Sequence, residues 1–528
     1  MKEMNERAKK NPNKELWVFF DEINTCLSFS LLTEILSNKT FYGEKINDNI
    51  KLIGACNPYI KKEEGIERNG FGIENKNNKE LVYMVQPLSQ SLLNYVLNIG
   101  DINENDEKNY IYSIIEQLFV KGEEKLHEVT KELIFNCHKY LRDKFDPSVV
   151  SLREIARFPK IVNFFKKYFS IKRKYEEYDN KNTEKFEKII CIINSVYLCY
   201  YIRLKDENQR IEFNKKLKEY FISLVNTIKT NEIIDNVKEE EKDDNEVKED
   251  LASKVYNNKN LKIFIQEKGI KYFVDFLRLE ETYLLDKIEI KIGIGKNELL
   301  KEIVFLMFVS INTNIPLIVI GKPGIGKSLS FLLICNSMKG KYSKNKFFRE
   351  FPPIILSYFQ GSESTKPEDI EKLFEIAENK LQFYKDKEKF QNKTIPISLI
   401  LFNEMGLSEK SKSNPLKVLN SKLDYGGNEE GVSFIGISDY SLDADKENRA
   451  IILSVHNLED KIDQLRNTCN SIVESISDEL NDNIIFEILS RAYYQYKNQL
   501  KFIKELIVLK QYNEKVERID MHKVFFEK

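Results

Sequence analysis

The chain has 528 residues, of which 42% are hydrophobic and 12% aromatic, and its 82 Lys and Arg residues balance 83 Asp and Glu residues to a formal net charge of -1. This length suits roughly three to four domains with sizeable cores. The balanced charge gives no sign of a nucleic-acid partner, and no apolar run reaches the length of a membrane span, so we expect neither partner.

The cysteines and the start of the chain indicate a compartment. Seven cysteines form no Cys-x-x-Cys pair, and the chain has only four histidines. This favours buried free thiols in a reducing compartment over a zinc site or a disulfide framework. The first residues, "MKEMNERAKKNPNKE", lack the apolar core of a signal peptide. We therefore expect a cytoplasmic protein.

Residues 15–60 are predicted to form a strand, a helix and a second strand. The apolar run "LWVFF" leads directly into Asp21 and Glu22, as in a buried parallel strand that delivers two carboxylates to its C-terminal edge. The second strand, "IKLIGAC", ends at Asn57. The two carboxylates fit either a nucleotide site or the capping of the helix that follows, because acidic residues are favourable at a helix N-terminus.

The middle of the chain is predicted to be mainly helical up to residue 228. Apolar residues recur three and four positions apart in "SLLNYVLNI", "IYSIIEQLFV", "VTKELIFNCHKYL" and "IARFPKIVNFFKKYF". Residues 229–260 contain the charged run "NEIIDNVKEEEKDDNEVKEDL", which lacks aromatic residues. We interpret this part as an exposed acidic linker, disordered or partly helical, with a functional acidic segment as the alternative.

Alternating strands and helices return from residue 286. Four apolar segments read as buried strands: "IPLIVIG", "PIILSY", "ISLILF" and "VSFIGIS". Between the first of them and an apolar helix lies "GKPGIGKS" at 321–328, which matches the phosphate-binding pattern Gly-x-x-x-x-Gly-Lys-Ser. We therefore predict a nucleotide site in an α/β fold, with ATP and Mg²⁺ as its cofactors.

The chemistry of this loop assigns roles to its residues. The glycines let backbone N–H groups wrap the phosphates, Lys327 can reach the terminal phosphates, and Ser328 can ligate Mg²⁺. The residues expected to contact the nucleotide are consecutive: Gly321, Lys322, Pro323, Gly324, Ile325, Gly326, Lys327, Ser328 and Leu329.

Two later strands supply the polar groups expected beside the phosphates. "ISLILFNEMG" places Glu404 where it can orient an attacking water. Asn403 stands where an Asp on the metal side is expected, and asparagine brings no negative charge to Mg²⁺. Asp439, after the strand "VSFIGIS", occupies the position of a γ-phosphate sensor with an unfavourable charge. Both indicate slow hydrolysis or none, unless Asn403 is a tolerated replacement in a working site.

The motifs of the second half resemble one AAA+ module of the mysterin family, giant RING-finger ATPases that act as ubiquitin ligases. The resemblance runs through "NELLKEIVFLMFVSINTNIPLIVIGKPGIGKSLS", "FQGSEST", "NEMGLSEKSKSNPLKVLN" and "VSFIGISDYSLDADKENRAI". The stretch from "VFFDEINTCLSF" to "IGACNPY", with "LVYMVQPLSQSLLNYVLNIGD" and "VVSLREIARF", looks like the module before it. The resemblance covers most of the chain outside 229–260.

The resemblance implies an α/β fold made of tandem AAA+ modules, each a P-loop NTPase parallel sheet with flanking helices and a helical lid subdomain. We expect 1–80 to be the later part of a first core whose phosphate loop lies upstream, and 81–228 to be its lid. Residues 229–260 are the linker, 261–460 the core of the second module, and 461–528 the start of its lid. The chain then reads as a segment of a larger polypeptide, or as a split or decayed copy of one.

The same resemblance implies roles at the first site. Asp21 would help hold Mg²⁺ through water, Glu22 would polarise the attacking water, and Asn57 would sense the γ-phosphate. Arg153 matches the family position that reaches the nucleotide from the lid, with Arg157 the less favoured candidate.

Arg449 matches the arginine that completes the site of the preceding module and would point at Asp21 and Glu22, where it would stabilise charge on the transferred phosphoryl group. The alternative is an ordinary surface arginine in a weak ion pair.

Three functions follow as hypotheses. The first is an ATPase core, contacting neighbouring AAA+ modules, whose movements are coupled in the full-length protein to ubiquitin ligase activity and its machinery. The second is a scaffold braced by bound ATP without turnover. The third, less well matched by the motifs, is a tandem AAA+ mechanoenzyme resembling dynein or midasin. No RING finger or zinc segment is recognisable in this sequence.

Overall fold

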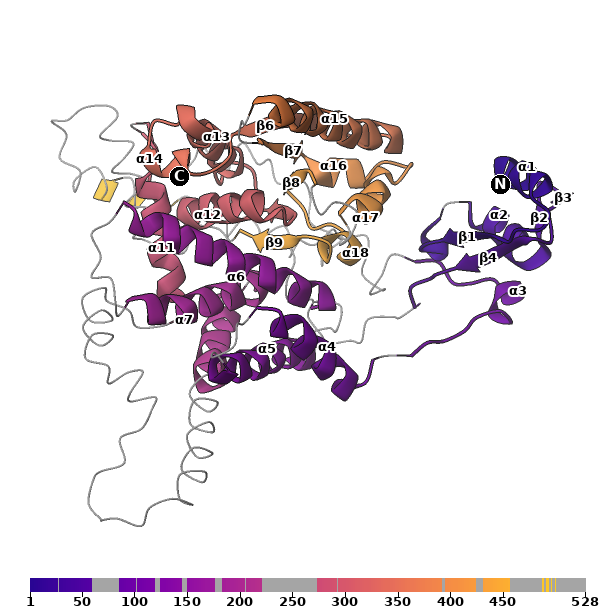
Figure 1. Ribbon diagram of the computed structural model, residues 1–528, viewed down its shortest axis with the longest axis horizontal. Coiled ribbons are helices and arrows are strands. Elements are labelled where there is room, and N and C mark those ends of the chain that lie inside the picture. The colour runs from indigo at the N-terminus through magenta and orange to yellow at the C-terminus, as the bar shows by residue number, and fades with distance from the viewer. Residues whose placement is uncertain are drawn as a thin grey trace, which may run out of the picture. The chain divides into compact units, whose positions relative to one another are not determined.

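The computed structural model describes residues 1–26, 28–58, 85–100, 102–118, 124–144, 150–175, 183–204, 206–220, 273–291, 293–391, 395–423 and 431–455, with a few residues between 487 and 499 (Figure 1). It divides into two compact units, one of residues 1–288 and 301–457 and the other of residues 289–300 and 458–528. The acidic linker and nearly all of the second lid lie outside the described residues, so the domain boundaries remain predictions.

A five-stranded parallel sheet organises the second half of the chain. Its order is β6 (Ile354–Gln360), β7 (Ile397–Asn403), β8 (Ser433–Ser438), β5 (Leu317–Ile320) and β9 (Ile451–Ser454). The first four are the predicted strands, and β9 was not predicted. Parallel strands buried on both faces read as continuous apolar runs, and every residue of β5, β8 and β9 is buried.

Helices cover both faces of this sheet. On one face, Ile400 and Phe402 of β7 belong to one core cluster with Phe374 of α15 (Pro367–Gln391) and Leu419 of α17 (Val418–Leu423). On the other face, the Ser433 hydroxyl donates to the Ile311 carbonyl of α12 (Glu298–Thr313), which places α12 against it. The shorter elements of this half are η5 (Gly340–Tyr342), α14 (Lys346–Arg349), α16 (Met405–Glu409), η6 (Pro415–Lys417) and α18 (Ala444–Glu447).

The first residues form a smaller α/β unit. Strand β1 (Leu16–Phe20) pairs in parallel with β4 (Ile50–Gly54), and β2 (Thr40–Phe41) forms a hairpin with β3 (Glu44–Lys45). The helical elements around them are α1 (Lys2–Lys10), η1 (Ile23–Thr25), α2 (Phe29–Thr33) and η2 (Glu34–Asn38).

Only one face of this small sheet is buried in the described residues. Val18 and Phe20 pack into a cluster with Ala8 of α1 and Ile35 of η2, whereas Trp17 is 65% exposed and Phe19 is 62% exposed. The prediction of a fully buried strand at 16–20 was therefore wrong for one of its faces, because β1 has a helix over one side and none described over the other.

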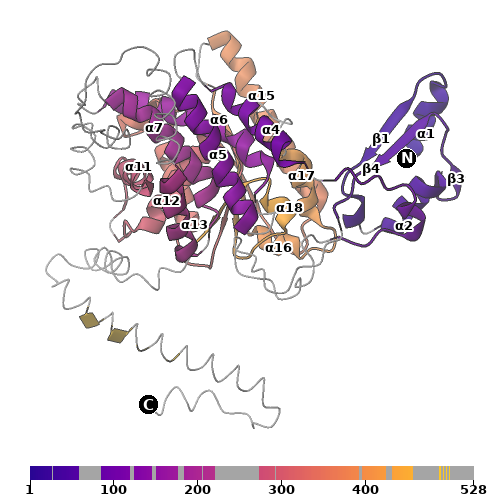
Figure 2. The same cartoon turned by 90° about the horizontal axis from the view of Figure 1, so that it is seen from below.

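The helical part follows, as predicted for most of its length. It comprises α3 (Gln90–Leu93), α4 (Glu104–Glu116), α5 (Glu124–Lys144), α6 (Leu152–Arg173), α7 (Thr183–Val196), η4 (Tyr197–Tyr201), residues 207–220 and α11 (Val274–Asp286). Figures 1 and 2 show α4, α5 and α6 side by side. Helix α3 ends at Leu93, so the helix predicted over 91–99 is wrong beyond that residue.

Helix α6 joins this helical part to the second core. It starts with a capping box, in which the side chains of Ser151 and Glu154 each accept a hydrogen bond from a backbone N–H group at the start of the helix. Phe164 and Phe165 of α6 lie with ring centroids 5.8 and 6.2 Å from Phe308 and Phe305 of α12. No helix in the part of the chain that the structure describes combines the length and apolar character needed to cross a membrane.

Candidate nucleotide site

The first half of the chain, which contains β1 and β4, and the second half, which contains β5 to β9, repeat one arrangement of strands in the same register. Phe20 of β1 lies opposite Gly54 of β4, and Phe402 of β7 lies opposite Gly436 of β8. Glu22 lies two residues after Phe20, and Glu404 lies two residues after Phe402. The two predicted catalytic glutamates therefore occupy equivalent positions after equivalent strands.

Both glutamates hold the same unusual backbone conformation. Glu22 has φ 51° and ψ 48°, and Glu404 has φ 56° and ψ 42°. Residues other than glycine are uncommon in this left-handed region, and such strain is concentrated at functional sites. The shared conformation supports equivalent roles for the two edges.

The loop between β5 and α13 (Lys327–Ser337) has the backbone that a phosphate-binding loop needs. Gly324 and Gly326 adopt φ angles of 85° and 92°, which glycine accepts at little cost. A Cβ on Gly321 would collide with the Ile325 side chain. Helix α13 begins at Lys327, and the N–H groups at a helix N-terminus generally favour a nearby anion.

The predicted loop residues differ in exposure. Lys322, Pro323, Gly324 and Ser328 are exposed, Ile325, Gly326 and Leu329 are half-buried, and Gly321 and Lys327 are buried.

Lys327 reaches across this loop to the edge of β8. Its ammonium donates to the carbonyls of Gly321 and Lys322 and lies 2.8 Å from a carboxylate oxygen of Asp439. Asp439 follows β8, so the structure brings the predicted sensor position to the predicted phosphate-binding lysine. This charged contact satisfies both groups within the protein.

Glu404 shares the charge environment of that pair. Burial raises the pKa of Glu404 above its ordinary value, the negative charge of Asp439 raises it further, and Lys327 opposes the rise. The neighbouring Asn403 amide donates to the Gln360 side chain at 2.9 Å, across the two adjacent strands. The second site thus gathers Lys327, Glu404 and Asp439, while Asn403 is tied to β6.

This donor set fits a nucleotide with its magnesium ion. Ser328 offers a hydroxyl at the start of α13, and Glu404 and Asp439 offer carboxylates at the sheet edge. Hydroxyl and carboxylate oxygens are ligands that Mg²⁺ accepts, usually together with water and phosphate oxygens.

The Glu22 carboxylate is held by residues of the second half. The Asn420 amide nitrogen lies 2.9 and 2.8 Å from its two oxygens, and Arg449 Nη2 lies 3.3 Å from Oε1. Arg449 is 4% exposed, so it is a buried arginine at the predicted glutamate and not an ordinary surface one. Glu22 makes no side-chain capping bond to η1, which argues against the capping alternative.

Further contacts fix the two halves around Glu22. The Lys417 ammonium donates to the Glu22 carbonyl at 3.3 Å and to the Thr25 hydroxyl at 2.6 Å. The Arg449 Nε also donates to the Asn420 carbonyl at 3.2 Å. Sequence reasoning missed Lys417 and Asn420, because their partners lie almost 400 residues away and neither residue belongs to a local motif.

Asp21 and Asn57 lie at the same edge as Glu22. Asp21 is exposed directly after β1, and Asn57 is half-buried after β4. The buried Asn24 side chain accepts from the Asn57 N–H at 3.3 Å and donates to its carbonyl at 2.8 Å. Asn24 is another residue that the sequence did not single out.

The two arginines predicted to reach the nucleotide from the lid, Arg153 and Arg157, have different environments. Arg153 is half-buried in the first turn of α6. Arg157 is 3% exposed and donates to Glu154 and to the carbonyls of Asn448 at 2.8 Å and Ala450 at 3.2 Å.

Arg203 also pairs with Glu154, at 2.7 Å, and donates to the Ala450 carbonyl at 3.3 Å. Two arginines of the helical part thus hold the peptide carbonyls on either side of Arg449.

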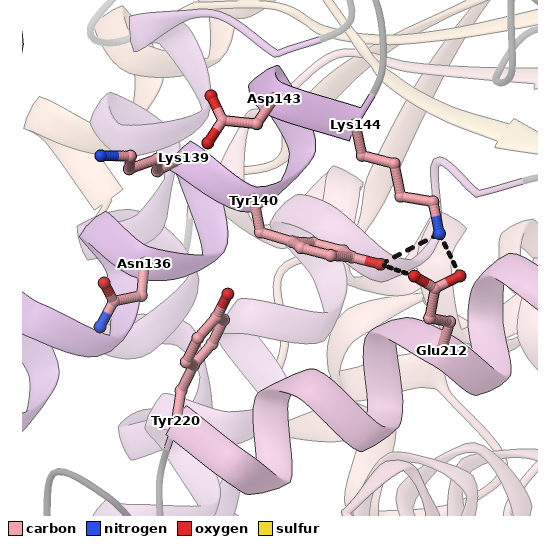
Figure 3. A pocket seen from close by; sticks show the side chains of 7 residues that line it. All are labelled: Asn136, Lys139, Tyr140, Asp143, Lys144, Glu212 and Tyr220. Atoms are coloured by element: carbon pink, nitrogen blue, oxygen red, sulfur yellow. Dashed lines mark hydrogen bonds and ion pairs between the residues drawn. The ribbon is translucent and has the colours of Figure 1, made fainter.

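The cavity in Figure 3 lies elsewhere, between α5 and residues 207–220, and has a volume of about 500 Å³. Its Lys144 ammonium contacts the Glu212 carboxylate, and the Tyr140 hydroxyl donates to Glu212 at 2.8 Å. The hydrogen bond from Lys144 lowers the pKa of Glu212. Lys139 and Asp143 add one charge of each sign, so this cavity lacks the excess positive charge of a phosphate site.

The comparisons with known proteins agree with this architecture. Residues 293–461 match a family model described as the RNF213 AAA domain. The chain is 29% identical over 485 residues to an E3 ubiquitin-protein ligase, rnf213-beta, of Danio rerio, covering 86% of this chain and 8% of that protein. It is 26% identical over 470 residues to the human and mouse E3 ubiquitin-protein ligase RNF213, covering 83% of this chain and 8% of each relative.

The chain therefore spans about 8% of the length of these relatives. In sequence the chain resembles the mysterin (RNF213) family, and its residues 293–461 match the model of that family's AAA domain.

Proposed function

We propose that this chain is an ATP-binding AAA+ segment of a mysterin-like ATPase, in which the second half binds ATP and completes the Glu22 site of the first half. The observation that carries the proposal is the loop of residues 321–328, whose glycine conformations and buried Lys327 suit a bound triphosphate.

At the second site, the chain's own residues divide the work. Backbone N–H groups from Gly324 to Ser328 bind the phosphate oxygens, and Lys327 leaves Asp439 for the terminal phosphates. Mg²⁺, when bound, supplies charge neutralisation between the phosphates. Glu404 orients a water, and the neutral Asn403 slows hydrolysis because it adds no charge at the metal.

At the first site, Arg449 and Glu22 link the two halves. Lys417, Asn420 and Arg449 belong to the same half as the phosphate loop, so a nucleotide-dependent shift of that half would move all three relative to Glu22. For Glu22 to polarise a water, its carboxylate must also leave Asn420. The relatives are named ubiquitin ligases, and we infer that such movements are coupled to ligase activity in a full-length protein.

A binding experiment with two matched variants tests the proposed site. Lys327→Ala should abolish binding of a fluorescent ATP analogue, because it removes the ammonium that reaches the phosphates. Lys45→Ala is the control, since it also removes one ammonium group but lies in the β2–β3 hairpin, in an exposed ion pair with Asp48. Equal binding by Lys327→Ala and the unmodified chain, with both folded by circular dichroism, would refute the site.

A scaffold braced by ATP without turnover is the second candidate. It is favoured by Asn403, which is bonded to Gln360, and by Glu22, which is engaged by Asn420. Steady-state phosphate release separates the two functions. If the chain is a slow ATPase, the Glu404→Gln variant should lose the phosphate release of the unmodified chain. If it is a scaffold, neither the unmodified chain nor this variant should release phosphate above background.

A further inference from the structure

The two sheet edges carry the same three polar residue types with two of them exchanged. In the order of the chain these residues are Asp21, Glu22 and Asn57 in the first half and Asn403, Glu404 and Asp439 in the second.

The exchange is positional, because the strands are in the same register. Asn57 lies three residues after Gly54, and Asp439 lies three residues after Gly436, and each glycine faces the equivalent phenylalanine of the neighbouring strand. The carboxylate lost after β7 is therefore regained after β8, at the same edge of the sheet.

We propose that Asp439 supplies the carboxylate for the magnesium ion of the second site, so that the metal is held from the β8 side with Ser328 and not through Asn403. This inference rests on the proposed function, because it requires ATP at the 321–328 loop.

The ion pair of Lys327 is the first argument. Asp439 is within 2.8 Å of the ammonium that would neutralise the terminal phosphates, and its side chain is only 19% exposed. When Lys327 turns to the phosphates, the Asp439 carboxylate loses that partner in a poorly hydrated position, which is costly unless another cation replaces it. The divalent ion that accompanies ATP is that cation.

The charge balance is the second argument. Lys327 brings one positive charge to a site that holds the carboxylates of Glu404 and Asp439, and the phosphates of ATP add further negative charge. Without a metal ion, Asp439 repels the nucleotide. With a metal ion bound to Asp439, the same carboxylate favours nucleotide binding, because the ion lies between the carboxylate and the phosphates. Nucleotide affinity should therefore depend on Mg²⁺ through Asp439.

The Asn403 side chain is unsuited to hold the metal ion. Its amide nitrogen is bonded to Gln360 on β6, and its side chain carries no charge, so it cannot replace a carboxylate at the metal. Carboxylate oxygens are the protein ligands through which Mg²⁺ is usually held beside substrate phosphates.

The test measures the dissociation constant of a non-hydrolysable ATP analogue with excess Mg²⁺ and with EDTA. In the unmodified chain Mg²⁺ should tighten binding at least about tenfold, a difference of about 1.4 kcal/mol. In Asp439→Asn, binding should become tighter in EDTA and weaker in Mg²⁺, so that the ratio falls to near one. Asp48→Asn, in an exposed ion pair with Lys45, controls for the loss of one acidic charge.

A double variant provides rescue. Asn403→Asp with Asp439→Asn recreates the order of the first half and should restore the Mg²⁺ dependence. Binding of Mn²⁺ can be followed by electron paramagnetic resonance, because the signal of the free ion is lost when it binds. In the presence of the analogue, Mn²⁺ should bind to the unmodified chain and to the double variant, and more weakly to Asp439→Asn.

Equal tightening of binding by Asp439→Asn with Mg²⁺ and with EDTA would overturn the inference, because Asp439 would then only repel phosphate. If the unmodified chain binds the analogue neither with Mg²⁺ nor with EDTA, the proposed function itself is overturned.

Discussion

The guanidinium of Arg449 lies 3.3 Å from the carboxylate of Glu22, although 427 positions separate the two residues in the chain. Both side chains are buried, and Asn420 contacts the same carboxylate. The contact joins the catalytic edge predicted for the first half to a residue between α18 and β9 of the second. It is one of several contacts that join the two halves.

This ion pair should contribute strongly to stability. Breaking a buried pair typically costs about 3 to 5 kcal/mol, so Glu22→Gln and Arg449→Met should each lower the free energy of unfolding by about that amount in urea titrations. The double variant should lose less than the sum, since neighbouring residues couple. Arg7→Met, which breaks an exposed pair with Glu3, should cost below about 1 kcal/mol. Additive losses at Glu22 and Arg449 would show that the pair is not coupled.

Asn420→Asp should destabilise the chain in a pH-dependent way. The new carboxylate would face both oxygens of Glu22, and two adjacent carboxylates cannot both ionise cheaply. The stability lost relative to the unmodified chain should be largest near about pH 7 and shrink as the solution is acidified towards the ordinary carboxyl pKa of about 4. Asn420→Ser, which adds no charge, should show a loss that changes less with pH than the loss in Asn420→Asp.

Glu154 should contribute to acid unfolding. Burial raises its pKa, but the charges of Arg203 and Arg157 and the hydrogen bonds from Ser151 together outweigh burial and hold the pKa below its ordinary value. A carboxyl with a lowered folded pKa stabilises the fold above its unfolded pKa of about 4.3, and this contribution is lost as the pH falls through the folded pKa.

In Glu154→Gln the free energy of unfolding should therefore be lower at neutral pH and depend less on pH in the acid range. Glu219→Gln, at an exposed pair with Lys216, is the control. An acid transition of unchanged steepness in Glu154→Gln would exclude this role.

Gly326→Ala should weaken nucleotide binding through the backbone alone. Gly326 has φ 92°, and a Cβ added to it would meet no atom within 4 Å, so the cost comes from the left-handed conformation, about 1 to 2 kcal/mol. If the loop relaxes away from this conformation, ATP affinity should fall roughly tenfold.

Gly43→Ala is a matched control, because Gly43 has φ 78° with the same open space but lies in the β2–β3 turn. Both variants should lose similar stability, and only Gly326→Ala should bind ATP less tightly. Equal affinities would mean that the loop conformation does not matter for binding.

The sequence predicted the second core well, because its signals are local. Strands β5 to β8 are apolar runs, and the spacing of the glycines with Lys327 marks the phosphate loop. Strand β9 has only four residues and gave no comparable signal. In β1 the apolar residues alone could not tell which face a neighbour covers, and Trp17 and Phe19 are exposed in the structure.

The contacts between the halves could be predicted only in part. The resemblance pointed Arg449 at Glu22, but nothing in the local sequence marked Asn420, Lys417 or Arg203. Their partners are set by the packing of elements that lie hundreds of residues apart. The pairing of Lys327 with Asp439 was likewise invisible, although the sequence does show that the charge of Asp439 is unusual at that position.

Hydrogen–deuterium exchange of the backbone amides, with and without MgATP, tests the central claim most directly. If the loop binds the phosphates, saturating MgATP should slow exchange in peptides that cover residues 321–334, and Lys327→Ala should remove this protection. Peptides covering α4 should exchange equally in both conditions. Unchanged exchange at 321–334 in the unmodified chain would contradict ATP binding at this site.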